Sequence, residues 1–247
     1  MKLNCDLGEG LDHLDRQIIP MVDQVNVACG GHAGDQQSIY HCLRLAKENH
    51  TEVGLHPSYP DRENFGRVQL DISEQSLRQS LLEQCSFFLN CASGLGIVAS
   101  YLKPHGALYN AMVKDFSLFC LIINVLKELQ SGFALPGLRL MCPASVMPLK
   151  FLQYVQQQQV KLLFEGFADR AYCTDGSLMP RSLPGAVLTD HRQVLERVNG
   201  LVNKKGLRTT DGDWLALEID SLCVHGDTPG AVEMVRAIRK QILPIHV

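Results

Sequence analysis

The chain has 247 residues, a formal net charge of −3, and a composition of 46% hydrophobic and 20% charged residues, which is typical of globular proteins. It has no basic tail and no long run of one charge, and no window approaches the roughly 20 apolar residues of a membrane span, so neither a nucleic acid nor a membrane is expected as a partner. The length allows one large domain or two small ones, with a sizeable core.

Nine cysteines are present without a CxxC pair, and most of them lie inside apolar runs. We interpret them as reduced cysteines that serve as small core residues. The first ten residues, MKLNCDLGEG, place acids where an export signal needs its apolar region. Together with the odd number of cysteines, this predicts a cytoplasmic protein.

Short apolar segments alternate with helical patterns along the whole chain. The expected strands, in chain order, are 2–5, 25–29, 53–55, 97–102, 138–141, 161–164 and one within 219–224. The expected helices, in the same order, are one ending near Val22, one capped by Asp35, one from Ser73 to Gly94, one from Ala107 to about Leu129, a glutamine-rich one after Ser145, one near Asp190 to Val198, and one opened by Thr228 and Pro229.

Seven such β-α units without a linker indicate a parallel sheet. A single (β/α)7 TIM-like barrel over residues 1–247 is the favoured interpretation, because about 250 residues is the usual size of that class. A doubly wound open sheet is the alternative. Its GxGxxG fingerprint begins with Gly8 and Gly10, but His13 stands where the third glycine belongs, and the phosphate loop GxxxxGK[ST] is absent from the sequence.

Polar side chains cluster where the expected strands end. These residues are Asp6 and Glu9; Asn26 and His32; His56; Lys103 and His105; Glu165, Asp169 and Arg170; and His225 and Asp227. Parallel strands point the same way, so these groups are expected to meet at one rim, where ligands bind in such barrels. Each has a structural alternative when taken singly: Asp6 can cap a helix, and Asp169 with Arg170 can be a surface ion pair of little energetic value.

Two kinds of chemistry fit this rim. Histidines with Asp6 could hold a divalent metal ion, although the sequence has no HxH or HExxH motif. Alternatively, imidazoles and carboxylates move protons while Lys103 and Arg170 hold a developing negative charge. The long polar segment 58–70 is expected to cover such a site.

Several stretches resemble the LamB/YcsF family, which is that of the A subunit of bacterial 5-oxoprolinase. The matching stretches, in chain order, are LNCDLGEG (3–10), VNVACGGHAGD (25–35), GLHPSYPD (54–61), NFGR (64–67), LKPHGALYN (102–110), FADRAY (167–172), LMPR (178–181) and CVHGDTPGAV (223–232). They cover the chain from end to end in the family order. Val68 and Gly31 depart from the family pattern, which affects the shape expected of the covering segment and the cavity.

The resemblance implies a barrel like those of glycoside hydrolases and polysaccharide deacetylases. It implies ATP-dependent opening of the lactam 5-oxo-L-proline to L-glutamate, with ADP and phosphate as products and ATP as co-substrate. It also implies two partner subunits, B and C.

We combine the rim and the resemblance into a set of expected roles. The expected catalytic residues are Asp6, Glu9, His56, His105 and Asp169, and the expected substrate- or phosphate-binding residues are Asn26, His32, Lys103, Arg170, His225 and Asp227. Two alternatives remain open at this point. The chain could be a metal-dependent amide hydrolase or deacetylase acting alone, or a non-catalytic binding subunit of a hydrolase complex.

Overall fold

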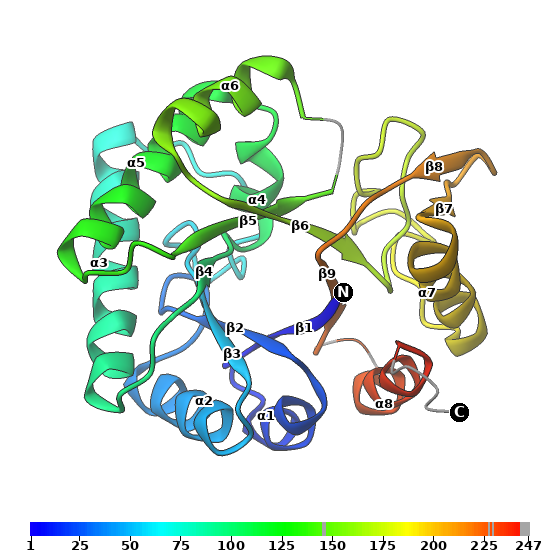
Figure 1. Ribbon diagram of the computed structural model, residues 1–247, viewed down its shortest axis with the longest axis horizontal. Coiled ribbons are helices and arrows are strands. Elements are labelled where there is room, and N and C mark those ends of the chain that lie inside the picture. The colour runs from blue at the N-terminus through cyan, green and yellow to red at the C-terminus, as the bar shows by residue number, and fades with distance from the viewer. Residues whose placement is uncertain (145–146, 227, 229, 243–247) are drawn as a thin grey trace.

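A closed barrel of parallel strands forms the centre of the molecule (Figure 1). The computed structural model describes residues 1–144, 147–226, 228 and 230–242. Within these residues the strands follow the order β1 (Lys2–Leu7), β2 (Gln24–Ala28), β3 (Glu52–His56), β4 (Tyr101–Leu102), β5 (Arg139–Pro143), β6 (Leu162–Phe167) and β9 (Ser221–His225), which pairs with β1. The predicted (β/α) barrel is confirmed, and the doubly wound sheet is excluded.

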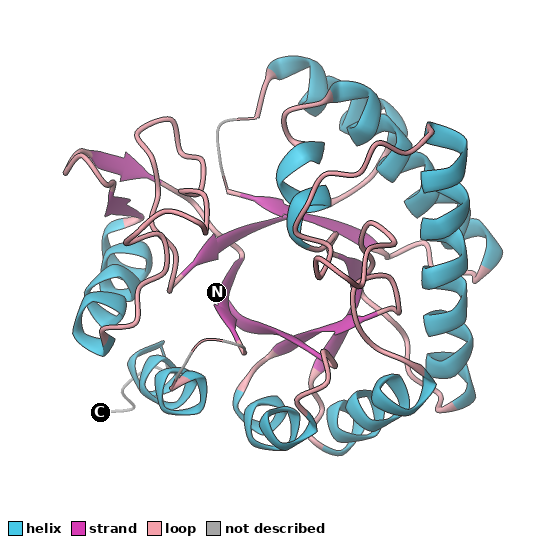
Figure 2. Ribbon diagram, turned by 180° about the vertical axis from the view of Figure 1, so that it is seen from behind, coloured by secondary structure: helices cyan, strands magenta, loops and turns pink. Residues whose placement is uncertain are grey.

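Helices surround the barrel and cover the outer faces of the strands (Figure 2). They are α1 (Asp12–Ile18), the 3₁₀ helix η1 (Ile19–Met21), α2 (Gln36–Glu48), α3 (Glu74–Gly94), α4 (Gly106–Met112), α5 (Phe116–Gly132), α6 (Leu149–Gln158), α7 (His191–Lys204) and α8 (Ala231–Ile242). The predicted caps Asp35 and Ser73 are confirmed, since each side chain accepts a hydrogen bond from the main-chain N–H three residues later. Pro229, expected in the first turn of the last helix, lies outside the described residues.

The segment after Lys103 differs from the prediction of one long helix. It forms α4 and α5, which are bent by 112° relative to each other. The cause is local: Asp115 accepts hydrogen bonds from the main-chain N–H groups of Ser117 and Leu118, so it starts a new helix instead of continuing the first.

Three other expectations need correction. The strand expected at 97–102 is reduced to β4, because the apolar run before it lies outside the ladder and Val98 is 71% exposed. The first helix ends at Ile18 and continues only as η1, and α7 runs on to Lys204. An antiparallel hairpin, β7 (Gly206–Arg208) and β8 (Trp214–Ala216), lies outside the barrel between α7 and β9 and was not predicted (Figure 1).

Polar groups fill the barrel below its mouth. Asn4 donates a hydrogen bond to the Ser221 hydroxyl (2.7 Å), which in turn donates to Gln24 (2.7 Å). Above them the Tyr101 ring occupies the space that Gly54 leaves open, because a Cβ at that glycine would lie 2.1 Å from the ring. These side chains fill the interior of the barrel among the described residues, as is usual for this class of barrel, in which ligands bind at the carboxyl-terminal mouth.

All nine cysteines are free thiols, and all but Cys120 and Cys173 are buried. This agrees with the interpretation of cysteine as a core residue.

In the part of the chain that the structure describes, no single helix has the length and apolarity needed to cross a membrane; α4 and α5 meet that criterion only when counted together, across their bend.

Candidate active site

A cavity of about 140 Å³ opens at the carboxyl-terminal mouth of the barrel. Its lining includes Asp6, Glu9, His56, Arg67, Lys103, His105, Tyr109, Asn110, Phe167, Arg170, Leu178, Arg181 and His225. These side chains come from the ends of β1, β3, β6 and β9, from the segments after β1, β3, β4 and β6, and from α4. The prediction that strand ends far apart in sequence meet at one rim is confirmed.

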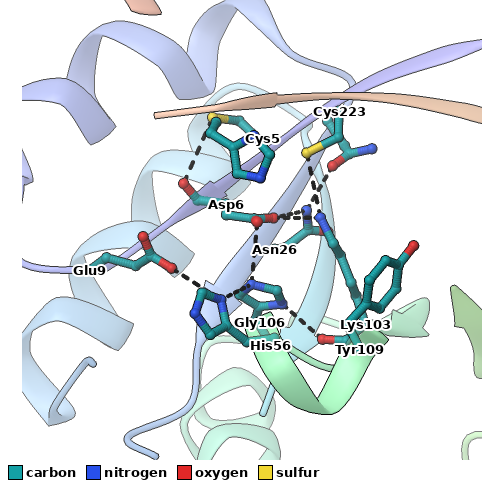
Figure 3. A network of polar contacts seen from close by, with 12 residues as sticks. Cys5, Asp6, Glu9, Asn26, His56, Lys103, Gly106, Tyr109 and Cys223 are labelled. Atoms are coloured by element: carbon teal, nitrogen blue, oxygen red, sulfur yellow. Dashed lines mark hydrogen bonds and ion pairs between the residues drawn. The ribbon is translucent and has the colours of Figure 1, made fainter. Parts of the chain in front are cut away.

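A buried lysine lies at the bottom of this cavity (Figure 3). Lys103 is 2% exposed, and its Nζ donates to Asp6 Oδ1 (2.7 Å) and lies 2.9 Å from Glu165 Oε1. Asn26 also donates to Asp6 Oδ1 (2.6 Å), and Tyr109 donates to Glu165 Oε2 (2.7 Å). One cation therefore holds two carboxylates from different strands, and each carboxylate has a further donor.

This network sets the protonation of its members. Burial by itself raises the pKa of Asp6, but the charge of Lys103, followed by the contact with His56, outweighs burial, so the pKa lies well below its ordinary value. Burial by itself lowers the pKa of Lys103, but Asp6, Cys223 and Glu165 raise it well above its ordinary value. Asp6 and Lys103 are therefore both charged at neutral pH.

Two histidines face each other beside Asp6. His105 Nδ1 lies 3.0 Å from His56 Nε2, and His56 Nε2 lies 3.4 Å from Asp6 Oδ2. The other nitrogen of each ring meets a main-chain carbonyl: that of Lys103 for His56 (2.8 Å) and that of Phe65 for His105 (3.0 Å). Burial, followed by His32 and His56, lowers the pKa of His105 well below its ordinary value. His105 is therefore a neutral imidazole at pH 7.

The segment after β3 packs over these histidines. The Phe65 ring lies edge-on to His32 and His105, at 5.1 and 5.5 Å between ring centres. Gly66 accepts a hydrogen bond from the main-chain N–H of Ala107 (3.0 Å), which ties the segment to α4. The expectation that residues 58–70 cover the site agrees with this packing.

Glu9 and His32 form a second pair next to His56 and His105. His32 Nε2 lies 3.0 Å from Glu9 Oε1, and the His32 ring stacks on His105 with 3.6 Å between ring centres and 2° between planes. Burial lowers the pKa of His32, although the hydrogen bond with Glu9 opposes this. The stack positions His105 from one side, while Phe65 positions it from the edge.

Asp169 positions His225. Asp169 is fully buried, and its carboxylate accepts hydrogen bonds from His225 Nδ1 (3.0 Å), the His225 main-chain N–H (3.3 Å) and the Thr228 hydroxyl (3.1 Å). Burial raises the pKa of Asp169, but His225 outweighs burial, so the net shift is downward. With Nδ1 held by the carboxylate, His225 has Nε2 left for a ligand in the cavity that it lines.

Three arginines also line the cavity: Arg67, Arg170 and Arg181. Arg170 also donates to the main-chain oxygens of Ala186 (3.2 Å) and Met179 (2.6 Å), which tie it to the segment after β6. Burial and the neighbouring charge of Arg181 lower its pKa to about 10, so it stays charged at neutral pH. This concentration of positive charge suits an anionic ligand.

The structure sorts the expected site residues into two groups. Asp6, Glu9, His56, Lys103, His105, Arg170 and His225 line the cavity, whereas Asn26, His32 and Asp169 lie behind it and hold a lining residue. Asp227 lies outside the described residues. The roles themselves stay predictions.

Four participants received no role from the sequence: Glu165, Tyr109, Arg67 and Arg181. A signal was available for each of them. Glu165 follows the expected sixth strand, and the other three lie inside stretches shared with the LamB/YcsF family. The sequence could not show that Glu165 and Tyr109 both contact Lys103 and that Tyr109 donates a hydrogen bond to Glu165.

Two clusters have the residue types of a metal site. The ligand atoms of Glu9, His32, His56 and His105 lie within 4.8 Å of one another, and so do those of Asp6, Cys223 and His225. In the second cluster the ammonium group of Lys103 already contacts both Asp6 and Cys223 (3.4 Å to the sulfur), so a cation is disfavoured there. The first cluster contains no such ammonium contact among the described residues.

Taken together, the mouth combines a neutral imidazole, a carboxylate-oriented imidazole, ionised carboxylates and arginines around one cavity. Such a set can transfer protons and bind an anion at the same place.

Known proteins match this chain along its whole length. The LamB/YcsF family pattern covers residues 1–246. The A subunit of the Pyrococcus furiosus 5-oxoprolinase is 37% identical over 244 residues, which are 97% of this chain and 92% of that protein. The crystal structure of the lactam utilization protein from Thermus thermophilus superposes with a TM-score of 0.84 at 32% identity and covers 97% of this chain and 94% of that one.

A GH113 β-1,4-mannanase shares the fold alone, with a TM-score of 0.52 at 11% identity over 96% of this chain and 97% of that one. The family match, in contrast, rests on sequence as well as on structure. From the pattern that covers residues 1–246 and the relatives that match at 32 to 37% identity, the chain belongs to the LamB/YcsF family.

Proposed function

We propose that this chain is the A subunit of an ATP-dependent 5-oxoprolinase, which opens 5-oxo-L-proline to L-glutamate while ATP becomes ADP and phosphate. The observation that carries the proposal is the match to the A subunit of a 5-oxoprolinase at 37% identity over nearly the whole chain. That relative is named as one member of an assembly, so the proposal includes partner subunits B and C. With ATP as co-substrate, the proposed location is the cytoplasm.

The geometry of the mouth supports this reaction. The substrate is a small ring with one carboxylate and one amide, and the cavity is lined both by positive charge from Arg67, Arg170 and Arg181 and by proton-transfer groups. Lys103 adds positive charge below the cavity and keeps Asp6 ionised. A carboxylate bound by these arginines lies in the same cavity as the histidines.

The chemistry explains why ATP and several proton-transfer groups are needed. The lactam oxygen takes the γ-phosphoryl group of ATP and ADP leaves, which makes the ring carbon electrophilic. Water adds to that carbon and loses a proton to a base. The ring nitrogen must then leave with a proton, because loss of phosphate instead would regenerate the lactam. A second water hydrolyses the resulting acyl phosphate to glutamate and phosphate.

The residues of the mouth suit these steps. Glu9, which lines the cavity, can accept the proton of the attacking water, while His105 stays unprotonated at pH 7 because its pKa lies well below its ordinary value. His225, oriented by Asp169, can deliver a proton to the departing nitrogen. Glu9 is half-buried at the cavity and can position a water.

The test is reconstitution with the partner subunits, following ADP and glutamate together. Asp6→Asn, Lys103→Ala and His105→Ala are each expected to lower ATP-coupled glutamate release by about 100-fold or more, the loss expected when groups that position or activate the reactants are removed. His191→Ala is the matched control, because His191 is exposed at the first residue of α7 and outside the cavity lining. Unchanged release in all three cavity variants would remove the assignment of the site.

Assaying the chain with and without its partners separates the proposal from the alternative of a hydrolase acting alone. The proposal expects no glutamate from the chain by itself, with or without ATP. ATP-independent amide hydrolysis by the chain alone would contradict it.

A further inference from the structure

The two facing histidines present lone pairs to each other. His56 Nδ1 and His105 Nε2 each meet a main-chain carbonyl oxygen, which only accepts hydrogen bonds, so these two nitrogens carry the ring protons. In neutral rings the remaining nitrogens, His56 Nε2 and His105 Nδ1, are then bare acceptors, and they lie 3.0 Å apart. Two acceptors at that distance repel each other unless a positive centre lies between them.

Carboxylate oxygens approach the same point. Glu9 Oε1 lies 3.6 Å from His105 Nδ1, and Asp6 Oδ2 lies 3.4 Å from His56 Nε2. Four electron-pair donors from β1, β3, the segment after β1 and the segment after β4 thus line up at successive distances of 3.6, 3.0 and 3.4 Å. Two ligands at about 2.1 Å from a metal ion lie roughly 3.0 to 3.5 Å from each other. The 3.0 Å between the two imidazole nitrogens fits this spacing, and the 3.6 Å from His105 Nδ1 to Glu9 Oε1 is slightly longer.

His32 supports the cluster without joining it. Its Nδ1 has no hydrogen-bond partner among the described residues, whereas its Nε2 meets Glu9 Oε1. A neutral ring has one N–H, and the carboxylate side is the place where that N–H finds an acceptor. His32 therefore donates to Glu9 and holds that carboxylate in place.

We propose that His56 Nε2, His105 Nδ1 and Glu9 bind one divalent transition-metal ion of the zinc class at the mouth of the barrel. Two imidazoles among the ligands favour zinc, cobalt or manganese over magnesium and calcium, which prefer oxygen alone. The main-chain acceptors behind His56 and His105 are the outer contacts that orient metal-bound histidines. The site does not depend on the proposed function, because it follows from ring geometry.

The test uses the full-length chain without an affinity tag, stripped of metal with a chelator. Titration calorimetry with ZnCl₂ is expected to show one ion per chain, and CoCl₂ is expected to produce the visible absorption bands of cobalt bound to nitrogen ligands. MgCl₂ is the comparison ion and is expected to bind far more weakly. His105→Ala and Glu9→Gln are each expected to weaken zinc binding by at least about 100-fold, the upper end of the loss seen for outer contacts of metal sites.

His191→Ala is the matched control and is expected to keep the wild-type affinity, since it removes one exposed histidine and leaves the cluster intact. Circular dichroism shows whether each variant is folded; if His105→Ala is not, the isosteric Glu9→Gln decides. Absence of stoichiometric zinc and cobalt binding by the folded wild type overturns the proposal, and so does wild-type affinity in the folded cluster variants. In those cases a shared proton is the positive centre between the rings. Zinc binding without 5-oxoprolinase activity would keep the metal site and reject the function.

Discussion

Replacing Lys103 with methionine tests the central network of the mouth. Methionine keeps an unbranched side chain of similar length but removes the ammonium group that lies between Asp6 Oδ1 and Glu165 Oε1. Both carboxylates are buried, at 7% and 0% exposed, so the variant leaves two negative groups without their cation. Removing one partner of a buried ion pair costs about 3 to 5 kcal/mol of unfolding free energy, and the same range is expected here.

The pH dependence of Lys103→Met is a second signature. In the wild type the net shift of the Asp6 pKa is downward only because Lys103 and His56 outweigh burial. Without Lys103, burial dominates and the folded-state pKa of Asp6 is expected to rise above the unfolded value of about 4. The folded variant then binds more protons than the unfolded chain between pH 4 and that raised pKa. Its stability must fall as pH rises through this window, so the deficit relative to wild type is larger at pH 7 than at pH 5.

Urea unfolding of both proteins at pH 5 and pH 7 measures these quantities. The double variant Lys103→Met with Glu165→Gln removes one of the two buried negative charges that have lost their cation. It is expected to recover at least about 1 kcal/mol of unfolding free energy relative to Lys103→Met, a difference that a double-mutant cycle detects. A loss below about 1 kcal/mol at pH 7, or a deficit that does not change with pH, would refute the reasoning that Lys103 compensates buried charge.

Three further predictions concern the Asp169–His225 pair, the close approach at Gly106 and the helix cap at Asp115. Asp169→Asn is expected to lose about 1 to 3 kcal/mol of unfolding free energy at pH 7, because the buried carboxylate accepts hydrogen bonds from His225. The folded-state pKa of Asp169 is lowered, so this stabilisation is fully present above the unfolded pKa of about 3.9 and disappears as pH falls through the folded pKa. Urea unfolding should therefore show the difference in stability between variant and wild type becoming smaller in acid. Gly106→Ala is expected to destabilise by about 1 to 3 kcal/mol in thermal unfolding, since φ is +57° and a Cβ would lie 2.6 Å from the Gly66 oxygen. Asp115→Ala is expected to cost about 1 kcal/mol in urea unfolding through loss of the α5 cap.

Each of these outcomes has its own control. Gly137→Ala, where a Cβ meets nothing within 4 Å and φ is not positive, should stay within about 0.5 kcal/mol of wild type, and equal effects at both glycines would contradict the steric argument. A constant gap for Asp169→Asn from pH 7 to pH 3 would contradict the lowered pKa. Asp115→Asn should retain most of the stability, because asparagine also caps helices, and a loss equal to that of the alanine variant would contradict capping.

The fold was predictable because its signals are local. Seven buried strands alternate with amphipathic helices, and an alternating chain of this length closes into a barrel by burying each apolar face. Caps such as Asp35 and Ser73 act within one helical turn, so the sequence shows them directly. The break at Asp115 was missed because the apolar pattern continues across it, and the β7–β8 hairpin was missed because its strands have only three residues each.

The sequence by itself determined which side chains reach the mouth, since strand direction alone carries residues such as Asp6, His56 and Lys103 to the same end of the barrel. Only the tertiary structure decided their partners. That Lys103 lies between two carboxylates, and that two imidazoles face each other across 3.0 Å, depends on barrel closure and ring orientation. The physical reason is that charge compensation and ligation act over a few ångströms in space, between residues that lie far apart in the chain, such as Lys103 and Asp6, which are 97 positions apart.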